Sequence, residues 1–478
     1  MDLTQVLPLA APELLIAIGA LVVLMVGAFG GERSTGLVSL LCGLILVGAS
    51  YLAVQAPHGM AFNGAFIGDP LAVFGKVAVY LTSAVAISLG YGWLHRNNLK
   101  RFEYPVLILL AALGMSMMCS SGDLISLYVG IELHSLALYV LAAFHRDDAR
   151  SSEAGLKYFV LGALSSGLLL YGASLVYGFT GSMRFDAIAA ATVEAAGTTG
   201  NTGLLFGLVF MLCGLAFKVS AAPFHMWTPD VYEGAPTPSV MLFTTAPKMA
   251  AMVLIARVLY GAFGDALEQW RQVVVVISLL CFAVGAFGGL MQKDIKRLLA
   301  YSSIANIGYA LLALAAGTPQ GLQAMLVFMV LYMVDVTGIF AILLGLSREG
   351  RPITRVEDLA GLWKEKPFYA LALTILSLSL LGMPPLSGFW AKFFVFGAAI
   401  PAGLWVFAAL GLVASVAAGF YYLRMVKVMW FDPAPGPADR SPRDTRWVAL
   451  AATAFSFPVV LLLLGALSTA AGHAAGLY

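Results

Sequence analysis

Apolar stretches long enough to cross a lipid bilayer follow one another along almost the whole chain of 478 residues. A hydrocarbon core of about 30 Å is crossed by a helix of about 20 apolar residues. Only 11% of the residues are charged, against about 25% in an ordinary soluble domain. We therefore expect an all-α polytopic membrane protein of about fourteen transmembrane helices, with little chain left for a soluble domain.

The interruptions between apolar stretches place the expected spans. They lie near residues 12–30, 35–55, 71–94, 104–121, 122–144, 154–178, 202–236, 237–260, 272–291, 297–316, 319–347, 367–401, 403–430 and 447–472. The first stretch has neither a basic segment before it nor a cleavage-like site after it, so we interpret it as a retained helix and not as a signal peptide.

Lysine and arginine are distributed unequally between the two sides of these spans. The connections after odd-numbered spans hold 17 of them, whereas the connections after even-numbered spans hold only Arg184 and Arg271. Positive residues gather on the cytoplasmic side of membrane proteins. The asymmetry predicts that both termini lie outside, in the periplasm if the chain is in a bacterial inner membrane.

Two expected spans, 202–236 and 367–401, are too long for straight helices, and each contains proline: Pro223 in the first, Pro384 and Pro385 in the second. Proline lacks a backbone donor and interrupts a helix. We expect two discontinuous helices, with unwound backbone in a hydrated interior. The alternative is a pair of incidental proline kinks, which does not explain the lysine beside each break.

Spans seven and twelve are five apart and would cross the membrane in opposite directions, as two inverted five-helix units require. The expected organisation is therefore three N-terminal helices, a first repeat, a second repeat and a last helix, at residues 1–103, 104–260, 261–430 and 431–478.

Ionisable residues near the middle of spans indicate a function, because each charge at a helix centre costs about 2.5–3.5 kcal/mol. Glu132, Lys218, Lys248 and Lys392 are such residues. Our hypothesis is that Glu132 partners Lys218 and modulates its proton affinity, with Lys248 the next carrier and Lys392 the terminal one. His225 would relay protons between them, since imidazole exchanges protons near neutrality.

Other polar residues leave two interpretations open. Lys76 and Lys157 lie near span ends, where a lysine is either an interfacial anchor or a carrier. Asp335 is near the centre of span eleven and would balance a lysine or arginine that the sequence does not identify. A polar stripe in span ten either lines water or makes interhelical hydrogen bonds; it consists of Ser302, Asn306 and Tyr309.

The sequence argues against several other classes of site. The four cysteines lie singly in apolar stretches, without the spacing of a metal or iron–sulfur site, so we expect them to serve in packing and expect no metal centre. A formal net charge of +2, without a dense basic patch, does not favour nucleic-acid binding.

Several segments together are similar to the antiporter-like membrane subunits of proton-pumping NADH:quinone oxidoreductase, respiratory complex I. These segments are residues 128–139, 156–159 with Gly162, Ser165 and Ser166, 217–227, 294–309 and 382–394. The resemblance implies fourteen helices, two inverted repeats and a polar axis that continues into neighbouring subunits. Carried over position by position, it implies proton-transfer roles for Glu132, Lys157, Lys218, His225, Lys248 and Lys392.

The resemblance also implies partners and a subtype. No cofactor would bind this chain, because NADH, FMN, iron–sulfur clusters and quinone would be used by partner subunits. The partners would be the other membrane-arm subunits, including homologous antiporter-like ones, and membrane lipids. L-type subunits carry a long lateral helix after the bundle, whereas this chain ends at Tyr478, and M-type subunits generally have glutamate in place of Lys392. The N-type pattern fits best.

The expected function is outward proton translocation powered by redox chemistry in other subunits, since each proton costs about 2.3 kcal/mol per 100 mV. One alternative is a subunit of a multisubunit sodium/proton antiporter, which is built on the same fold. A second is a passive scaffold that binds neighbouring subunits and lipids. A third, a quinone-binding catalytic subunit, has little support because no redox-ligand cluster appears.

Overall fold

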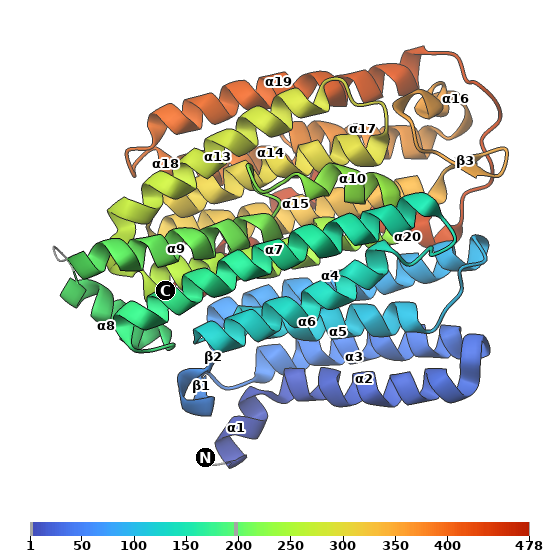
Figure 1. The fold of residues 1–478 in the computed structure, drawn as a ribbon. Helices are drawn as coiled ribbons and strands as arrows, with labels where there is room; N and C mark the ends of the chain where they lie inside the picture. The colour runs from blue at the N-terminus through green and yellow to red at the C-terminus, as the bar shows by residue number, and fades with distance from the viewer. Residues whose placement is uncertain (1–2, 196–198, 478) are drawn as a thin grey trace. The chain divides into compact units, whose positions relative to one another are not determined.

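The computed structural model of the chain describes residues 3–195 and 199–477, and most of these residues belong to helices (Figure 1). The chain divides into two compact units. The first unit comprises Met1–Val219, Ala246–Val274 and His473–Tyr478, and the second comprises Ser220–Thr245 and Val275–Gly472. Each unit is described by itself below.

The first unit is built from successive helices that pack against their chain neighbours. They are α1 (Leu3–Leu9), α2 (Ala11–Gly30), α3 (Thr35–Gln55), α4 (Pro70–Arg96), α5 (Glu103–Ser120), α6 (Leu124–Ala142), α7 (Ala149–Thr180), α8 (Phe185–Ala195), α9 (Thr199–Lys218) and α12 (Ala246–Ala256). A short antiparallel hairpin, β1 (Gly59–Ala61) with β2 (Phe66–Gly68), precedes α4. Helix α12 packs against α4, α5 and α9, and its residues are all buried.

The second unit surrounds α15, most of whose residues are buried. Its helices are α10 (Trp227–Gly234), α11 (Thr237–Thr244), α14 (Ile295–Ala315), α15 (Pro319–Gly345), α16 (Leu362–Glu365), α17 (Pro367–Leu381), α18 (Ser387–Ala399), α19 (Trp405–Phe431), α20 (Arg443–Ala454) and α21 (Val460–Ala474). Helix α13 (Leu267–Gly289) begins in the first unit and ends in the second, and the last two residues of α21, His473 and Ala474, belong to the first unit. Strands β3 (Ser347–Arg348) and β4 (Arg351–Pro352) form a small antiparallel hairpin. Helix α15 contacts α14, α17, α18 and α20.

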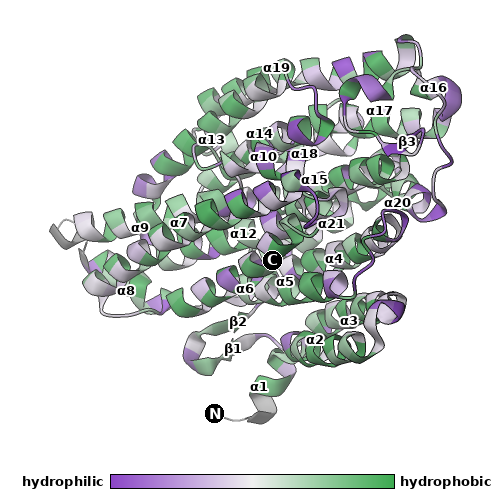
Figure 2. Cartoon of the chain, turned by 45° about the vertical axis from the view of Figure 1, so that its right-hand side comes forward, coloured by the Kyte–Doolittle hydropathy of each residue, from purple (hydrophilic) through white to green (hydrophobic). Residues whose placement is uncertain are grey.

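Apolar residues cover most of the helical surface, and polar residues gather at helix ends and loops (Figure 2). Eleven segments among the described residues are long and apolar enough to cross a membrane. One of them, Ala11–Gln55, contains both α2 and α3, which a turn at Gly31–Ser34 separates. The all-helical, polytopic fold class is confirmed, whereas the number of fourteen crossings and the boundaries of two five-helix repeats stay predictions.

Both predicted helix breaks are confirmed. Helix α9 ends at Lys218, and α10 begins only at Trp227; Pro223 lies in the irregular segment between them. Helix α17 ends at Leu381 and α18 begins at Ser387, with Pro384 and Pro385 in the gap. Proline at these places prevents the backbone ladder from continuing.

The eighth span differs from the expected single helix over 237–260. Helix α11 ends at Thr244, Thr245 has φ −118° and ψ −93°, and α12 begins at Ala246. Pro247 explains the interruption, because proline lacks a backbone donor and restricts the residue before it. A π-helical turn, Arg257–Ala262, then follows α12 directly.

Two connections match each other in detail, one in each unit. Asp123 caps α6, and its backbone forms an isolated antiparallel bridge with that of Arg184. Asp294 caps α14, and its backbone forms the same kind of bridge with that of Arg355. Equivalent residues are 171 positions apart, 294 − 123 and 355 − 184. The flanking backbone hydrogen bonds follow the same spacing: Leu124 N to Met183 O and Phe185 N to Gly122 O in the first unit, Ile295 N to Thr354 O and Val356 N to Lys293 O in the second.

Candidate functional site

Lys218 is the last residue of α9, so its cation lies at the end of a half-helix. The side chain is buried, and Nζ donates a hydrogen bond to Ser135 Oγ of α6 at 2.9 Å. Ser135 in turn donates to the carbonyl of Ile131 at 2.6 Å. The last carbonyls of a helix lack intrahelical donors and carry partial negative charge, which favours a cation at this position.

Glu132 is one turn before Ser135 on α6, and its carboxylate accepts a hydrogen bond from Ser166 of α7. Its charge acts on Lys218, but no ion pair joins the two side chains among the residues that the structure describes. The direct hydrogen-bond acceptor of the Lys218 amine is Ser135. The predicted partnership with Glu132 would therefore be a longer-range electrostatic interaction.

Lys248 is completely buried on α12, in the same unit as Lys218 and Glu132. His225 lies in the segment before α10, which belongs to the second unit, and its buried Nδ1 has no hydrogen-bond partner among the described residues. An imidazole nitrogen without a fixed partner is free to accept or donate a proton. The relay from His225 to the lysines stays a prediction.

Lys392 is buried on α18 and reaches back to the end of the preceding half-helix. Its Nζ donates to Ser415 Oγ at 2.6 Å, to the carbonyl of Leu381 at 2.7 Å and to the carbonyl of Leu380 at 3.2 Å. The ammonium also lies 4.7 Å from the centre of the Tyr309 ring. Two carbonyls at the end of α17, a hydroxyl and an aromatic face therefore surround this cation.

Gly382 makes the approach of Lys392 to α17 feasible. It ends α17 in a left-handed conformation, with φ +98°. A Cβ added to Gly382 would lie 2.9 Å from Lys392 Cδ. A residue without a side chain is needed here for both reasons.

Asp335 is bound by hydroxyls, not by the lysine or arginine expected from the sequence. It is completely buried on α15 and accepts hydrogen bonds from Ser379 at 2.6 Å and from Ser387 at 2.9 Å. Ser387 also bonds Ser456 at 2.9 Å. The sequence could not reveal this group, because the serines belong to α17, α18 and the π-helical turn Phe455–Val459, far from Asp335 along the chain.

The polar stripe of α14 makes hydrogen bonds within the second unit, as one of the two interpretations expected. Ser302 bonds the hydroxyl of Tyr422 at 2.5 Å, and Tyr309 donates to the carbonyl of Gly411 at 2.7 Å. Asn306 donates to the carbonyl of Ser302 at 2.9 Å. Tyr309 additionally faces Lys392, so part of the stripe contributes to the lysine site.

The two lysines near span ends differ. Lys157 forms an ion pair with Glu153 at 2.8 Å, and its side chain is 41% exposed. Lys76 is buried and paired with Glu13 of α2 at 2.7 Å, so the interpretation of Lys76 as an interfacial anchor is wrong. Position along the span did not reveal this pair, although a lone acidic residue at the start of the first apolar stretch was a signal for a buried partner.

Another pair that the sequence analysis missed joins Arg257, within the eighth expected span, to Asp69 at the start of α4. A charged residue inside an apolar span was again the available signal. Among the described ranges, no group of three or more histidine, cysteine, aspartate or glutamate residues could hold a metal ion.

Discontinuous helices that hold buried lysines at their broken ends define a class: polytopic helical membrane proteins of the ion-transporter kind. The family model described as NADH:quinone oxidoreductase/Mrp antiporter, TM, matches residues 121–418. The chain belongs to this family.

Two relatives with high sequence identity align with most of the chain. A protein of a Caulobacter species named NADH-quinone oxidoreductase subunit N is 63% identical over 390 residues, which are 81% of this chain and 80% of that protein. The protein of the same name in Rhodospirillum rubrum is 50% identical over 93% of this chain and 92% of its own length.

Solved structures agree with this assignment. A chain of respiratory complex I from Thermus thermophilus with bound aureothin is 33% identical, with a TM-score of 0.82 over 97% of this chain and 99% of that chain. A chain of the Mrp complex from a Dietzia species shares the fold, with 24% identity and a TM-score of 0.86 over 100% of this chain and 98% of that one.

Proposed function

We propose that the chain translocates protons outward as a membrane-arm subunit of an NADH:quinone oxidoreductase, with the energy supplied by redox chemistry in other subunits. The observation that carries the proposal is the lysine at each helix break, buried and bound by neutral acceptors. The names of the relatives and the match to a chain of complex I support the choice of enzyme.

Neutral acceptors suit a lysine that must release its proton. Lys218 donates to a hydroxyl oxygen, and Lys392 donates to a hydroxyl oxygen and to carbonyl oxygens. When such an amine becomes neutral, no uncompensated carboxylate charge stays behind. A compact amine on a flexible stem can also change partners between its two protonation states.

The proposed sequence of carriers follows the two units. Glu132 modulates Lys218, the proton passes to Lys248 within the same unit, and Lys392 is the carrier of the second unit. His225 relays protons, and Lys157, whose side chain is partly exposed, exchanges them at the surface of the chain.

Orientation and partners complete the proposal. The distribution of lysine and arginine, 17 against two, supports an inner-membrane orientation with both termini in the periplasm. The partners are other membrane-arm subunits, homologous antiporter-like subunits among them, and membrane lipids. Exposed apolar side chains on α2, α3 and α19 offer surfaces for these contacts.

The second candidate function is that of a subunit of a sodium/proton antiporter, which the fold shared with the Mrp chain favours. The two candidates differ in what drives them. A sodium antiporter exchanges ions without NADH, whereas the proposed subunit works only while NADH is oxidised.

The deciding experiment replaces Lys218 by methionine in the assembled NADH:quinone oxidoreductase and measures NADH oxidation and proton pumping in membrane vesicles. Lys427→Met is the matched control, because Lys427 is 62% exposed and lies outside the proposed carriers. We expect pumping to be lost in Lys218→Met and kept in the control. Unchanged pumping in Lys218→Met would leave the scaffold interpretation, and activity that needs sodium and ignores NADH would favour the antiporter.

A further inference from the structure

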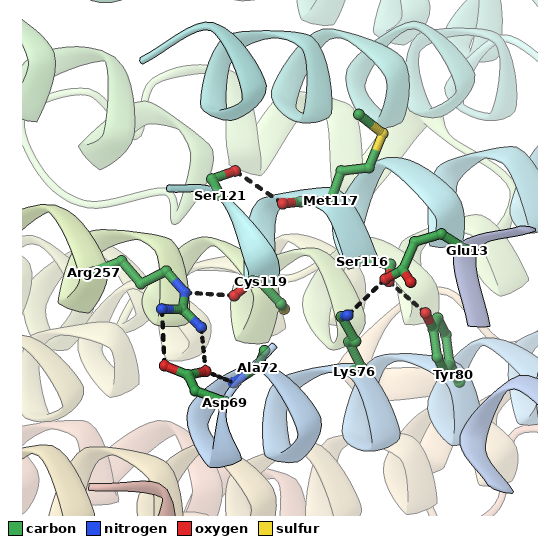
Figure 3. Close-up of polar contacts among 10 residues, drawn as sticks. All are labelled: Glu13, Asp69, Ala72, Lys76, Tyr80, Ser116, Met117, Cys119, Ser121 and Arg257. Atoms are coloured by element: carbon green, nitrogen blue, oxygen red, sulfur yellow. Dashed lines mark hydrogen bonds and ion pairs between the residues drawn. The ribbon is translucent and has the colours of Figure 1, made fainter. Parts of the chain in front are cut away.

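A buried ion pair in the first unit joins Glu13 and Lys76 (Figure 3), on helices that hold none of the proposed carriers. Glu13 is in the first turn of α2, and Lys76 is in the second turn of α4. Their charged atoms are 2.7 Å apart, and the side chains are only 10% and 4% exposed. Removing two charges from water is expensive, and a buried pair is weak support for stability, so its presence here needs another reason.

Hydroxyl groups extend this ion pair on one side. Ser116 of α5 donates to Glu13 Oε1, the same oxygen that binds Lys76, and the hydroxyl of Tyr80 bonds Ser116. The other oxygen, Glu13 Oε2, is buried and has no hydrogen-bond partner among the described residues. A carboxylate that binds two donors on one oxygen and none on the other has a vacant position for a proton.

The Arg257–Asp69 pair lies near this ion pair (Figure 3). Arg257 follows α12 directly, nine residues after Lys248, a rise of roughly 13 Å along a helix. Its Nε donates to the carbonyl of Cys119 at 2.5 Å, and its Nη atoms bind Asp69 at 2.5 and 3.1 Å. Cys119 is one turn after Ser116 on α5. The two ion pairs therefore contact successive turns of this helix, one through Ser116 and the other through Cys119.

This region lies at one end of its helices. Asp69 caps the start of α4 and is 35% exposed, and Glu13 is in the first turn of α2. With the N-terminus outside, both helix starts lie at the outer side of the membrane. Arginine does not give up its proton in proteins. The Arg257–Asp69 pair is therefore a fixed electrostatic element, whereas Glu13 and Lys76 can exchange a proton.

From this arrangement we infer that Glu13 and Lys76, with Ser116 and Tyr80, form a proton-binding site through which the first unit releases protons at its outer side. The inference rests on the proposed function and assigns the first unit a release group of its own, besides Lys392. A proton moves from Lys76 Nζ to the Glu13 carboxylate, which converts the ion pair into a neutral amine and a neutral acid. The acid then gives its proton to the outer side, and the amine accepts the next proton from the direction of Lys248.

The competing interpretation is that the ion pair only fastens α2 to α4 and α5. The two interpretations differ for the double variant Glu13→Gln/Lys76→Met, which removes both charges and nearly preserves both volumes. Apolar or neutral replacement of a complete buried pair is often neutral for stability. A fastening role therefore predicts normal assembly and normal pumping, whereas a release site predicts normal assembly and impaired pumping.

The test measures NADH oxidation and proton pumping by the assembled NADH:quinone oxidoreductase in membrane vesicles. We expect the double variant to lower the pumping rate at least about threefold, while the matched control Glu32→Gln/Arg101→Met, which removes an exposed ion pair, keeps it. Tyr80→Phe removes a single oxygen and should lower pumping less; it keeps the inference testable if the double variant does not assemble. Unchanged pumping in Tyr80→Phe and in an assembled double variant would overturn the inference.

Lys248→Met separates failure of the inference from failure of the proposed function. If Lys248→Met abolishes pumping and the double variant pumps normally, proton translocation stands and the Glu13–Lys76 release site is wrong. If Lys248→Met, Lys218→Met and the double variant all pump normally, the proposed function itself is wrong.

Discussion

The two units place a lysine at a broken helix in opposite ways. In the first unit, Lys218 is the last residue before the break, and a hydroxyl of another helix binds it. In the second, Lys392 comes after the break and reaches back to the carbonyls that end α17. What the sites share is the carbonyl end of a half-helix, which carries partial negative charge. The carbonyl end of a half-helix is thus common to both lysine sites, whereas the direct acceptors differ.

The acidic groups differ more than the lysines. The matched connections relate α6 to α14 by 171 positions, and by this spacing Glu132 corresponds to Ser303, since 303 − 132 is also 171. Ser303 is a partner of Tyr332, at 2.7 Å. The buried acid of the second unit is instead Asp335 on α15, which is surrounded by serines. Among the residues that the structure describes, a carboxylate therefore acts on the broken-helix lysine of the first unit, whereas no carboxylate is found to act on Lys392.

The largest effect is expected from arginine at either broken-helix lysine. Arginine keeps the positive charge but does not release its proton. Lys218→Arg and Lys392→Arg should each lower proton pumping at least about tenfold, or about 1.4 kcal/mol in the barrier. Pumping by vesicles containing the assembled complex is the measurement. If Lys392→Arg pumps normally while Lys218→Arg does not, the two units are unequal and the second is not a proton carrier.

The difference between the acids predicts unequal effects of their loss. Glu132→Gln keeps the acceptor for Ser166 but removes the charge that acts on Lys218, so pumping should fall severalfold. Ser303→Ala removes no charge, but it removes the acceptor of the Tyr332 hydroxyl, a hydrogen bond worth about 1 kcal/mol. It should cost stability and leave pumping nearly unchanged. Equal loss of pumping in both variants would contradict the assignment of the acid to the first unit alone.

Asp335 should matter more for stability than for the lysine site. Asp335→Leu leaves the hydroxyls of Ser379 and Ser387 without their acceptor and should destabilise the complex by about 1–3 kcal/mol. Asp335→Asn keeps an acceptor oxygen and should cost less than about 1 kcal/mol. Thermal denaturation of the assembled complex measures both. A loss of pumping in Asp335→Asn as large as that in Asp335→Leu, despite the smaller loss of stability, would show that the carboxyl itself carries protons.

Much of the fold could be predicted from the sequence because membrane helices depend on local composition. Apolar length and proline located both discontinuous helices, and the expected span 35–55 coincides with α3. The interruption at Thr245 was missed because the length of the eighth expected span fits a single straight helix, although Pro247 was an available signal for a break.

The lysines were found because a buried charge is conspicuous in an apolar span. Their partners were not, because Ser135, Ser415 and the carbonyl of Leu381 are ordinary residues that only the packing of separate helices places near them. The same limit applies to the acid groups. Nothing local in the sequence pairs Glu13 with Lys76, or Asp335 with serines of three later segments.

The smallest expected effect concerns the backbone at the two breaks. Ser220 has φ +61°, and its buried hydroxyl has no partner among the described residues, whereas Gly382 has φ +98°. A left-handed conformation costs a residue with a side chain about 1–2 kcal/mol relative to glycine. Ser220→Gly should therefore stabilise the complex by up to about 1 kcal/mol, and Gly382→Ala should destabilise it by a similar or larger amount, because its Cβ would meet Lys392.

Thermal denaturation measures both changes, with Gly397→Ala as the control, since a Cβ at Gly397 meets nothing within 4 Å. Whether Ser220→Gly raises or lowers the pumping rate decides whether the strained backbone at Ser220 contributes to transport. Strained backbone persists at functional sites where the surrounding structure enforces it. If Ser220→Gly is more stable but pumps more slowly, the strained turn after Lys218 contributes to transport. The first break would then differ from the second in that its left-handed residue is a serine and not a glycine.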